Sequence, residues 1–481
     1  MRWKEALLGS CVLLMACQAD DREPINLSEV SGSWLAVGPQ VEINEAGDVM
    51  TAWSEYSWLE FRSQAHSSHF DPGRGRWTGA QRLPHLENRQ NPGPNVGVMP
   101  SGEFVSWWSN AERSPSVGVC PAGQLMSSRF DNGDSVWTDP DSPAHALEAG
   151  VRMRQTRPNA KGQVGVLYSS ARPDTPGLVL LRRNSLDDEW DEGVYVDTAA
   201  QPQPGIECPA GYPYAEAGIA DDESVLLVGL DSRFDGGVLS NRLFATVLAP
   251  GDTTWSEREE LEIASSHSLS IAESAAERAY VVWPERPDPA DNDSPENRVR
   301  LAVFERGTMQ WQDMGIINDP EQGRVRGLVI EANRRGDVLI GWSQGVPYVQ
   351  RLDRSARLVG TPLPIRVRDE MSSVESRHIS LALNAHGDAA MGVAYTAGED
   401  DELAVLRLFR HDNELGAPTV VDQGRWAPGV YSEHPYIWDS DVAINDSGDA
   451  VVAWSRRNDW GASYRGDEVE VYSRDLWAAH F

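Results

Sequence analysis

The sequence predicts an all-β fold, a β-propeller of eight four-stranded blades closed by a strand from the N-terminal end of the chain. One unit recurs eight times: an alternating apolar run, a turn of the type Asn-x-x-Gly-Asp, a second apolar run, and an aromatic residue six positions after the turn glycine. The turns fall near residues 47, 102, 162, 223, 277, 336, 387 and 448, which are 51 to 61 residues apart. A repeat of this length in so long a chain is typical of a closed array of blades.

The copies differ in how well they keep the pattern. The clearest are VEINEAGDVMTAW (41–53), VIEANRRGDVLIGW (329–342) and VAINDSGDAVVAW (442–454), while LALNAHGDAAMGV (381–393) keeps the turn but has Val393 at the aromatic position. Weaker copies span 96–108, 156–168, 217–229 and 270–283. A seven-bladed ring is the alternative if the degenerate fourth unit is not a true blade.

A second signature follows about thirty residues after each turn. A strand-like run ends in a polar turn and a tryptophan, at Trp77, Trp137, Trp190, Trp255, Trp311 and Trp477; the sixth and seventh units have aliphatic residues near Leu358 and Leu415 instead. Runs with a period of two, separated by Gly, Asp and Asn turns, predict antiparallel strands. Each unit therefore contains four strands, and such sheets must stack around an axis to cover one another's faces.

Ring closure is expected between the two ends of the propeller domain, residues 31–481. The eighth unit stops soon after Trp477, where other units continue into a fourth strand. The segment Glu23–Val30 lies just before the first unit and is expected to supply the missing strand.

The first sixteen residues are typical of a signal peptide. A basic head, Met1–Lys4, precedes an apolar run over 6–16, which is shorter than the roughly 20 residues that a membrane-spanning helix needs. The following Leu14-Met15-Ala16-Cys17 resembles the bacterial lipobox, with Met15 as a small departure. The resemblance implies that Cys17 is acylated, with residues 17–30 forming an acidic tether and the closing strand. Gln18 in place of Asp implies outer-membrane sorting; an ordinary signal peptide with a chance cysteine is the alternative.

The charge excludes some partners. The chain has 42 Lys+Arg against 73 Asp+Glu, a net charge of -31. Such a surface is expected to repel phosphate backbones and anionic lipid headgroups, which argues against nucleic-acid binding. Lys4 and Lys161 are the only lysines, and the arginines form no basic patch along the chain.

Two cysteines remain for the mature domain once Cys11 leaves with the signal and Cys17 is lipidated. Cys120 and Cys208 each begin a Cys-Pro-Ala-Gly segment. In an oxidising compartment an even pair favours a disulfide, and two buried free thiols are the alternative. With nearly ninety residues between them and no adjacent histidine, they make a poor zinc site.

Binding is expected on the face that carries the B–C and D–A loops, if the strands of each blade are labelled A to D outward. These loops vary in length and chemistry, notably 199–218, 284–298 and 422–440, and variable loops on a rigid scaffold commonly bind ligands. Aromatic and acidic residues gather in the last of them and in the final B–C loop, which predicts a protein or glycan site at Trp426, Tyr431, His434, Tyr436, Trp438, Asp439, Asp441, Trp460 and Tyr464. The alternative is that these aromatics pack the loops onto the blades.

The loop 284–298 offers oxygen ligands of the kind that calcium uses, at Asp288, Asp291, Asp293 and Glu296. Their spacing matches no known calcium loop, and the prolines between them favour a solvated linker. No cofactor is predicted beyond this structural calcium.

The segments FDPGRGRW (70–77) and FDNGDSVW (130–137) resemble degenerate Asp-boxes of sialidase-like propellers, with one residue too many between Asp and Trp. The resemblance implies structural turns between the third and fourth strands, and no catalytic set can be assigned from it. The likeness to the propeller lipoprotein of the outer-membrane β-barrel assembly machinery is one of architecture only.

No nucleophile elbow, zinc-protease motif, phosphate loop or dinucleotide fingerprint occurs. The sequence therefore favours a non-catalytic binding or scaffold module at the cell envelope. A carbohydrate-active enzyme that uses the same loop face is the alternative.

Overall fold

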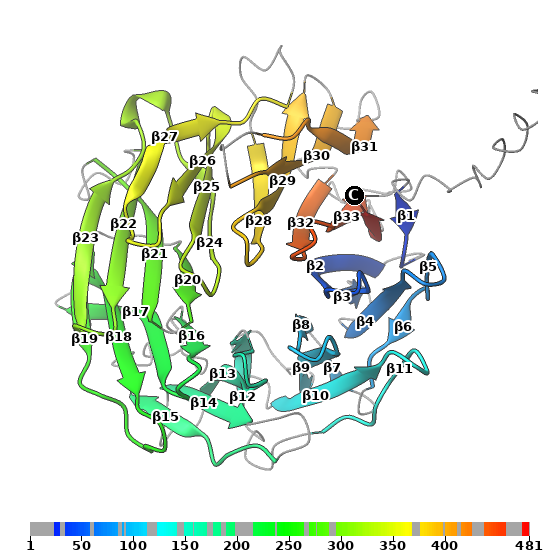
Figure 1. Cartoon of the computed structure of the whole chain (residues 1–481), viewed down its shortest axis with the longest axis horizontal. Helices are drawn as coiled ribbons and strands as arrows, with labels where there is room; N and C mark the ends of the chain where they lie inside the picture. Colours follow the sequence, from blue (N-terminus) through cyan, green and yellow to red (C-terminus); the bar gives the residue numbers. More distant parts are fainter. Residues whose placement is uncertain are drawn as a thin grey trace, which may run out of the picture.

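The chain forms a ring of eight β-sheet blades around a central axis (Figure 1); strand pairing joins blade 8 to blade 1 and blade 2 to blade 3. The computed structural model describes residues 24–28, 34–57, 62–84, 89–90, 93–112, 123–141, 149–156, 158–170, 177–183, 189–197, 215–235, 238–263, 269–275, 277–287, 295–367, 376–397, 400–410, 415–425, 437–457 and 474–480.

The first four blades are antiparallel sheets that follow one another along the chain. Blade 1 contains β2 (Trp34–Ile43), β3 (Val49–Ser57), β4 (Arg62–Asp71), β5 (Arg76–Trp77) and β6 (Gln81–Arg82). Blade 2 contains β7 (Arg89–Gln90), β8 (Asn95–Val98), β9 (Phe104–Glu112), β10 (Gly123–Asp131) and β11 (Val136–Trp137). Blade 3 contains β12 (Ala149–Gln155), β13 (Val164–Ser170), β14 (Gly177–Arg183) and β15 (Val194–Asp197). Blade 4 contains β16 (Ala215–Ile219), β17 (Val225–Asp235), β18 (Val238–Leu248) and β19 (Glu259–Ile263).

The last four blades complete the ring. Blade 5 contains β20 (Ser270–Ser274), β21 (Arg278–Glu285), β22 (Arg298–Glu305) and β23 (Gln310–Ile316), followed by the 3-10 turn η1 (Pro320–Gln322). Blade 6 contains β24 (Arg326–Ala332), β25 (Val338–Gln344), β26 (Val346–Leu352) and β27 (Leu358–Pro364). Blade 7 contains β28 (Ser376–Leu383), β29 (Ala389–Ala397), β30 (Asp400–Leu408) and β31 (Thr419–Arg425). Blade 8 contains β32 (Ile437–Ile444), β33 (Ala450–Arg457), β34 (Arg474–His480) and β1 (Ile25–Asn26). The eight-bladed prediction is confirmed, and the fourth unit is a true blade.

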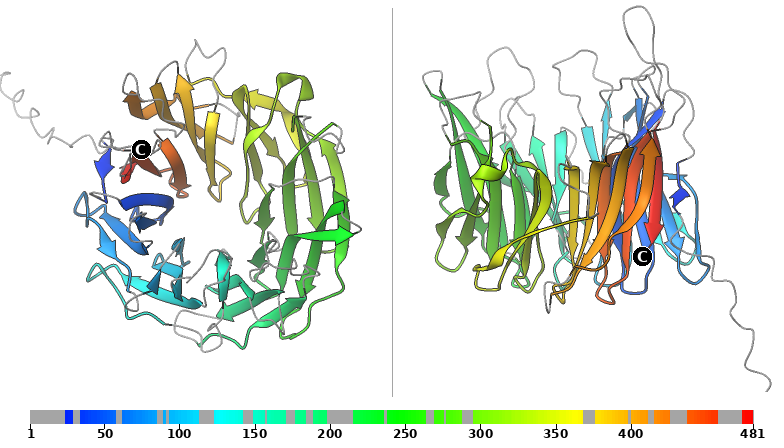
Figure 2. Two further views of the ribbon diagram at one scale, coloured as in Figure 1. Left: turned by 180° about the vertical axis from the view of Figure 1, so that it is seen from behind. Right: turned by 90° about the horizontal axis from the view of Figure 1, so that it is seen from above.

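The strands run between two faces of the ring (Figure 2, right panel). The A–B and C–D turns share one of them: in blade 1, a Cβ added at Gly47 in the A–B turn would lie 3.9 Å from the ring of Pro72 in the C–D turn. We call this the turn face. The B–C and D–A connections lie at the opposite end of the strands, which we call the loop face.

The predicted aromatic positions form the core between blades. Trp53, Trp108, Trp283, Trp342 and Trp454 each expose 1% or less of their surface. Each apolar cluster contains residues from two neighbouring blades; Trp342 of blade 6, for example, shares its cluster with Tyr280 of blade 5. Because each sheet covers its neighbour, a single blade does not have to bury both of its own faces.

The ring closes within blade 8. The short strand β1 pairs antiparallel with β34, where Ile25 opposes Ala478 and Asn26 opposes Trp477. Beyond β1, the Leu27 amide donates to the Leu476 carbonyl at 2.7 Å, and Asn26 Nδ2 donates to Asp475 Oδ2 at 2.8 Å. The predicted closure by an N-terminal strand is therefore confirmed, over a shorter strand than Glu23–Val30.

The predicted turns before the outer tryptophans also occur. Asp131 Oδ1 accepts the amides of Gly133 and Asp134 at 2.8 and 3.2 Å, and the Phe130 and Trp137 rings lie 5.3 Å apart. The resemblance of these turns to Asp-boxes stays a prediction.

Candidate functional site: a polar cavity at the turn face

The asparagine of the repeat holds the A–B turn together. Asn44 Oδ1 accepts the amides of Ala46 and Asp48 at 3.0 and 2.9 Å, and its Nδ2 donates to the Asp48 carboxylate at 3.1 Å. Gly47 has a φ of +84°, a left-handed conformation that glycine adopts without strain. The Asn-x-x-Gly-Asp pattern thus encodes a turn whose amides are satisfied by its own side chain.

The same side chains link each turn to the next blade. Among the described residues, a side chain of one turn donates a hydrogen bond to a main-chain carbonyl of the next turn at six of the eight junctions between blades. The donor and acceptor residues are Asn44 and Gly102, Asn159 and Ala220, Ser274 and Asn333, Asn333 and Asn384, Asn384 and Asn445, and Asn445 and Asn44, at 2.8 to 3.1 Å. The last of these bonds crosses the closure between blades 8 and 1. These bonds tie the turns of neighbouring blades together at six places around the axis.

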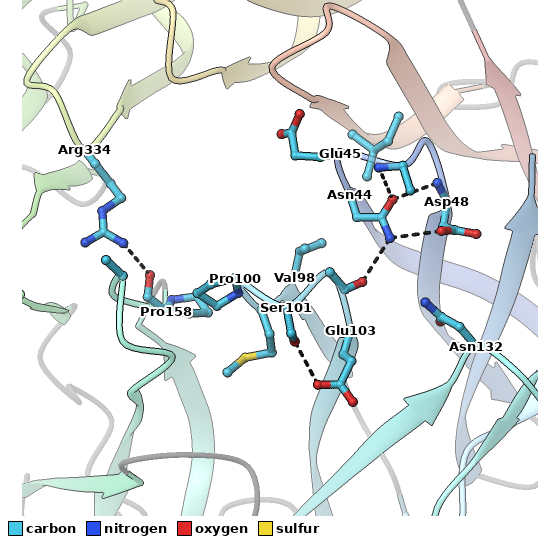
Figure 3. Close-up of a pocket in the computed structure, with 15 residues that line it drawn as sticks. Asn44, Glu45, Asp48, Val98, Pro100, Ser101, Glu103, Asn132, Pro158 and Arg334 are labelled. Atoms are coloured by element: carbon cyan, nitrogen blue, oxygen red, sulfur yellow. Dashed lines mark hydrogen bonds between the residues drawn. The ribbon is translucent and has the colours of Figure 1, made fainter.

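A cavity of about 660 Å³ opens within this ring (Figure 3). Turns of blades 1, 2 and 3 form most of its wall, and Arg334 of blade 6 lines it from the opposite side. Arg334 Nη1 donates to the Pro158 carbonyl at 3.4 Å, and its other nitrogen, Nη2, pairs with Asp221 of blade 4. The lining includes Glu45, Asp48, Pro100, Ser101, Glu103, Asn132, Pro158 and Arg334.

The carboxylates of the cavity are held as hydrogen-bond acceptors. Glu45 Oε1 accepts the Asp446 amide at 3.1 Å, and Glu103 Oε2 accepts the Ser101 hydroxyl at 2.8 Å. Behind the wall, His69 Nε2 lies 3.4 Å from Asp48 Oδ1. Burial lowers the pKa of His69 in spite of the opposing effect of the Asp48 carboxylate, so the imidazole is neutral at neutral pH.

Across the axis, Asp221 is held in its ionised form. A hydrogen bond from the Ala160 amide is the main reason that the pKa of Asp221 lies below its usual value, and the Arg334 guanidinium adds to the effect. The cavity therefore combines fixed acceptors, a guanidinium donor, and the rings of Pro100 and Pro158. This arrangement suits a neutral ligand that carries many hydroxyl groups.

Only part of the predicted ligand site lies in described residues. Asp439 and Asp441 are on β32, where their Oδ2 atoms accept the Gly38 and Val41 amides of β2 at 3.3 and 2.9 Å. Both carboxylates thus join blade 8 to blade 1. Trp438 is on the same strand, and the other predicted positions, Trp426, Tyr431, His434, Tyr436, Trp460 and Tyr464, lie outside the described residues. Their role in ligand binding stays a prediction.

The predicted lipid, disulfide and calcium positions are also untested. Cys17, Cys120, Cys208, Asp288, Asp291 and Asp293 lie outside the described residues. Glu296 is described, and its Oε1 lies 3.9 Å from Arg286 Nε. Within the described ranges, no group of three or more His, Cys, Asp or Glu side chains is placed to hold a metal ion. Within the same ranges, no helix has the length and apolarity to cross a membrane.

Sequence reasoning missed the cavity because it assigned binding to the loop face. One signal was present: the residues directly after two of the turn asparagines, Glu45 and Arg334, are charged, and both line the cavity. Reading that position across the repeats would have indicated a polar axial site.

Comparison with known proteins places this chain in no family. No protein-family model and no curated protein matches the sequence. Among solved structures, similarity extends to an ulvan lyase of a new polysaccharide lyase family (TM-score 0.43, 9% identity, covering 93% of this chain and 94% of that one). It also extends to the β-propeller domain of the Trilobed protease from Pyrococcus furiosus (0.42, 10%, 81% and 96%) and to the NanB sialidase from Streptococcus pneumoniae (0.36, 9%, 95% and 97%). At such TM-scores and identities, these likenesses assign no function to this chain.

Proposed function

We propose that the protein is a cell-envelope lipoprotein, anchored through Cys17, whose propeller binds a glycan without catalysis. The observation that carries the binding proposal is the turn-face cavity. Its walls are rigid turns, and its polar groups are already fixed by hydrogen bonds to the turns. A ligand that enters therefore meets a preformed site, which lowers the entropic cost of binding.

The lining favours a sugar over an amine or a phosphate. Sugar hydroxyls both donate and accept, and the cavity offers acceptors at Glu45 and Glu103 and donors at Asn132 and Arg334. The C–H face of a sugar ring can pack against Pro100 and Pro158. The carboxylates of Glu45 and Glu103 already accept bonds that orient the turns, which supports binding rather than proton transfer.

A glycan array probed with the purified full chain tests this function. We expect Glu103→Gln and Asn132→Ala each to weaken binding to any positive glycan by about tenfold, as expected for a hydrogen bond to a polar ligand. The matched control is Glu262→Gln on the exposed outer strand β19, which should bind like the native chain.

Three results would change the proposal. Release of a shorter sugar from a bound glycan would establish the alternative, a carbohydrate-active enzyme. Binding that survives both cavity substitutions would move the site to the loop face. A peptide from an envelope extract that binds in place of every glycan would make the module a protein receptor.

A further inference from the structure

The direction of β1 shows from which face the chain enters the ring. β34 begins at Arg474 on the loop face and ends at His480 on the turn face. The His480 ring lies 5.6 Å from the ring of Phe70, which is next to the end of β4 and its C–D turn. Since β1 is antiparallel to β34, β1 runs from the turn face toward the loop face. The chain therefore reaches Ile25 from the turn face.

Arginines gather at one part of this same face. The arginine sector consists of Arg334, Arg335, Arg354 and Arg357 of blade 6 and Arg410 of blade 7. Arg354 and Arg410 share one buried carboxylate: their Nη2 atoms lie 3.4 and 3.2 Å from Asp337. Along the chain these arginines are up to 76 residues apart, which is why the sequence showed no basic patch.

Positive charge exceeds negative charge in the arginine sector. The ion-pair partners of its five guanidinium groups are three carboxylates, those of Asp221, Asp337 and Asp353. No ion pair joins Arg335 to another described residue, and the Arg357 side chain is 76% exposed. Both groups can therefore reach an external anion.

The A–B turns of four other blades have the opposite charge. Carboxylates predominate in the A–B turns of blades 1, 2, 4 and 8, at Glu45, Asp48, Glu103, Asp221, Asp222, Glu223, Asp446 and Asp449. The arginine sector is thus a local exception in a chain of net charge -31. A local exception of this kind indicates a specific anionic contact rather than general solubility.

We propose that the turn face is directed toward the membrane and that the arginine sector contacts anionic lipid headgroups. The inference rests on the proposed anchor at Cys17. Seven residues separate Cys17 from Ile25, so even a fully extended tether reaches about 28 Å. Such a tether holds the turn face near the bilayer, and a basic patch adds a second membrane signal to a lipid chain.

Two further features follow from this orientation. Headgroups repel the acidic turns of blades 1, 2, 4 and 8, so contact is confined to the blade 6 side and the ring axis is inclined to the membrane normal. The cavity then opens toward the membrane surface, where the glycan part of a lipid would meet it, and the loop face points away.

Vesicle binding tests the headgroup contact separately from the anchor. The full chain with Cys17→Ser is mixed with phosphatidylcholine vesicles, with or without phosphatidylglycerol. We expect binding only to the anionic vesicles, decreasing with salt. Arg335→Gln with Arg357→Gln should weaken it roughly fivefold per arginine. The matched control is Arg324→Gln with Arg366→Gln, two exposed arginines at the loop face beside the same blades, which should bind as before.

Each contrary result has a distinct meaning. Equal loss in both double variants, or no loss in either, overturns the arginine sector as the contact. Displacement by inorganic phosphate at matched ionic strength makes it a discrete phosphate site instead of a membrane surface.

Orientation and anchor are tested on the native chain. Metabolic labelling with a fatty-acid analogue, compared with Cys17→Ser, reports the anchor. Arginine modification by phenylglyoxal on the membrane-bound chain should spare Arg335 and Arg357 and modify Arg324 and Arg366. If the chain incorporates the fatty-acid analogue but Arg335 and Arg357 are modified, the orientation is wrong and the anchor stands. If the chain does not incorporate the analogue, the anchor at Cys17 is wrong. The vesicle assay then tests the headgroup contact by itself.

Discussion

Blade 6 follows the sequence repeat closely and blade 4 departs from it, yet both form four antiparallel strands. Blade 6 has Asn333, Gly336 and Trp342 at the three defining positions, whereas blade 4 has Ala220, Glu223 and Gly229. The two blades show which features of the repeat are needed by the fold and which can be supplied from elsewhere.

The two blades fill the same core volume in different ways. In blade 6 the Trp342 indole is buried within its own cluster. In blade 4 the Phe244 ring, from the neighbouring strand β18, lies over Gly229, where a Cβ would come within 2.7 Å of it. Arg258 covers the other part of this ring, with its guanidinium carbon 4.4 Å from the ring centroid. In blade 4 a large buried side chain from the neighbouring strand thus occupies the place of the tryptophan of the repeat.

The turns differ in the same manner. The side chain of Asn333 satisfies its own turn and reaches the next blade. Ala220 has no such group, so blade 4 keeps only the bond from the preceding blade, in which Asn159 Nδ2 donates to the Ala220 carbonyl at 3.0 Å. Glu223 adopts a φ of 74° in place of glycine, and Arg306 of blade 5 pairs with Asp222 at 3.1 Å. The turn of blade 4 is thus held by its neighbours.

The largest expected effect comes from removing the large core side chain of each blade. Trp342→Ala and Phe244→Ala should each lower the free energy of unfolding by about 3 to 5 kcal/mol, because each leaves a cavity between blades. Urea denaturation followed by tryptophan fluorescence or circular dichroism measures both. A cost for Phe244→Ala far below that of Trp342→Ala would show that the ring does not replace the missing aromatic.

Adding a methyl group under the Phe244 ring should have the next largest effect. Gly229→Ala places its Cβ against Phe244 and Ala215, and we expect a loss of about 1 to 3 kcal/mol in unfolding free energy. The control is Gly307→Ala in the C–D turn of blade 5, where no atom lies within 4 Å of the added Cβ. The interpretation fails if both variants unfold at the same denaturant concentration.

The bond between turns should contribute less. Asn333→Ala removes the donor to the Asn384 carbonyl and the acceptor for two turn amides, with an expected cost of about 1 to 2 kcal/mol. Ser447→Ala is the matched control, because this hydroxyl bonds only within its own turn. Thermal unfolding of both variants measures the difference, and equal midpoints would contradict a role for the link between blades.

The smallest effect is a pH dependence in blade 4. Burial by itself would raise the pKa of Asp222, but hydrogen bonds from Ser224 and Arg306 outweigh it and lower the pKa from 3.8 to about 2. The ionised form therefore stabilises the fold above pH 3.8, and this contribution is lost as the pH falls toward 2.

The check is the unfolding free energy of the native chain and of Asp222→Asn across this range. The native chain should be the more stable above pH 3.8, and the two should converge near pH 2. Because Asp222 is largely exposed, solvent screening keeps the difference small. A constant difference at every pH would assign the effect to something other than this carboxylate.

Much of the architecture could be predicted because each unit repeats its own local code. Asn44 bonds to amides two and four residues ahead, and Gly47 follows three residues after it, so the turn depends on neighbours in the sequence. The closing strand could also be predicted, since the eighth unit was one strand short. The degenerate fourth unit was harder to assign, because Phe244 and Asn159, which complete it, belong to another strand and another blade.

The candidate site could not be predicted in the same way. Arg334 reaches a carbonyl 176 residues away, and Arg410 shares Asp337 with Arg354 across two blades. Neither contact leaves a pattern of spacing in the chain. Composition was misleading as well: a net charge of -31 predicts a surface that repels anions everywhere, although the fold concentrates arginines in one sector.

The sequence by itself therefore determined the length of the repeat, the position of the turns and the strand that closes the ring. These features depend on φ angles, side-chain bonds and apolar periodicity within a few residues, which the order of residues specifies directly. The tertiary structure alone decided which charged side chains meet at the axis, where arginines gather, and which face the N-terminal segment joins. These features depend on how eight similar sheets are arranged around an axis, which brings together residues from blades that are distant in the chain.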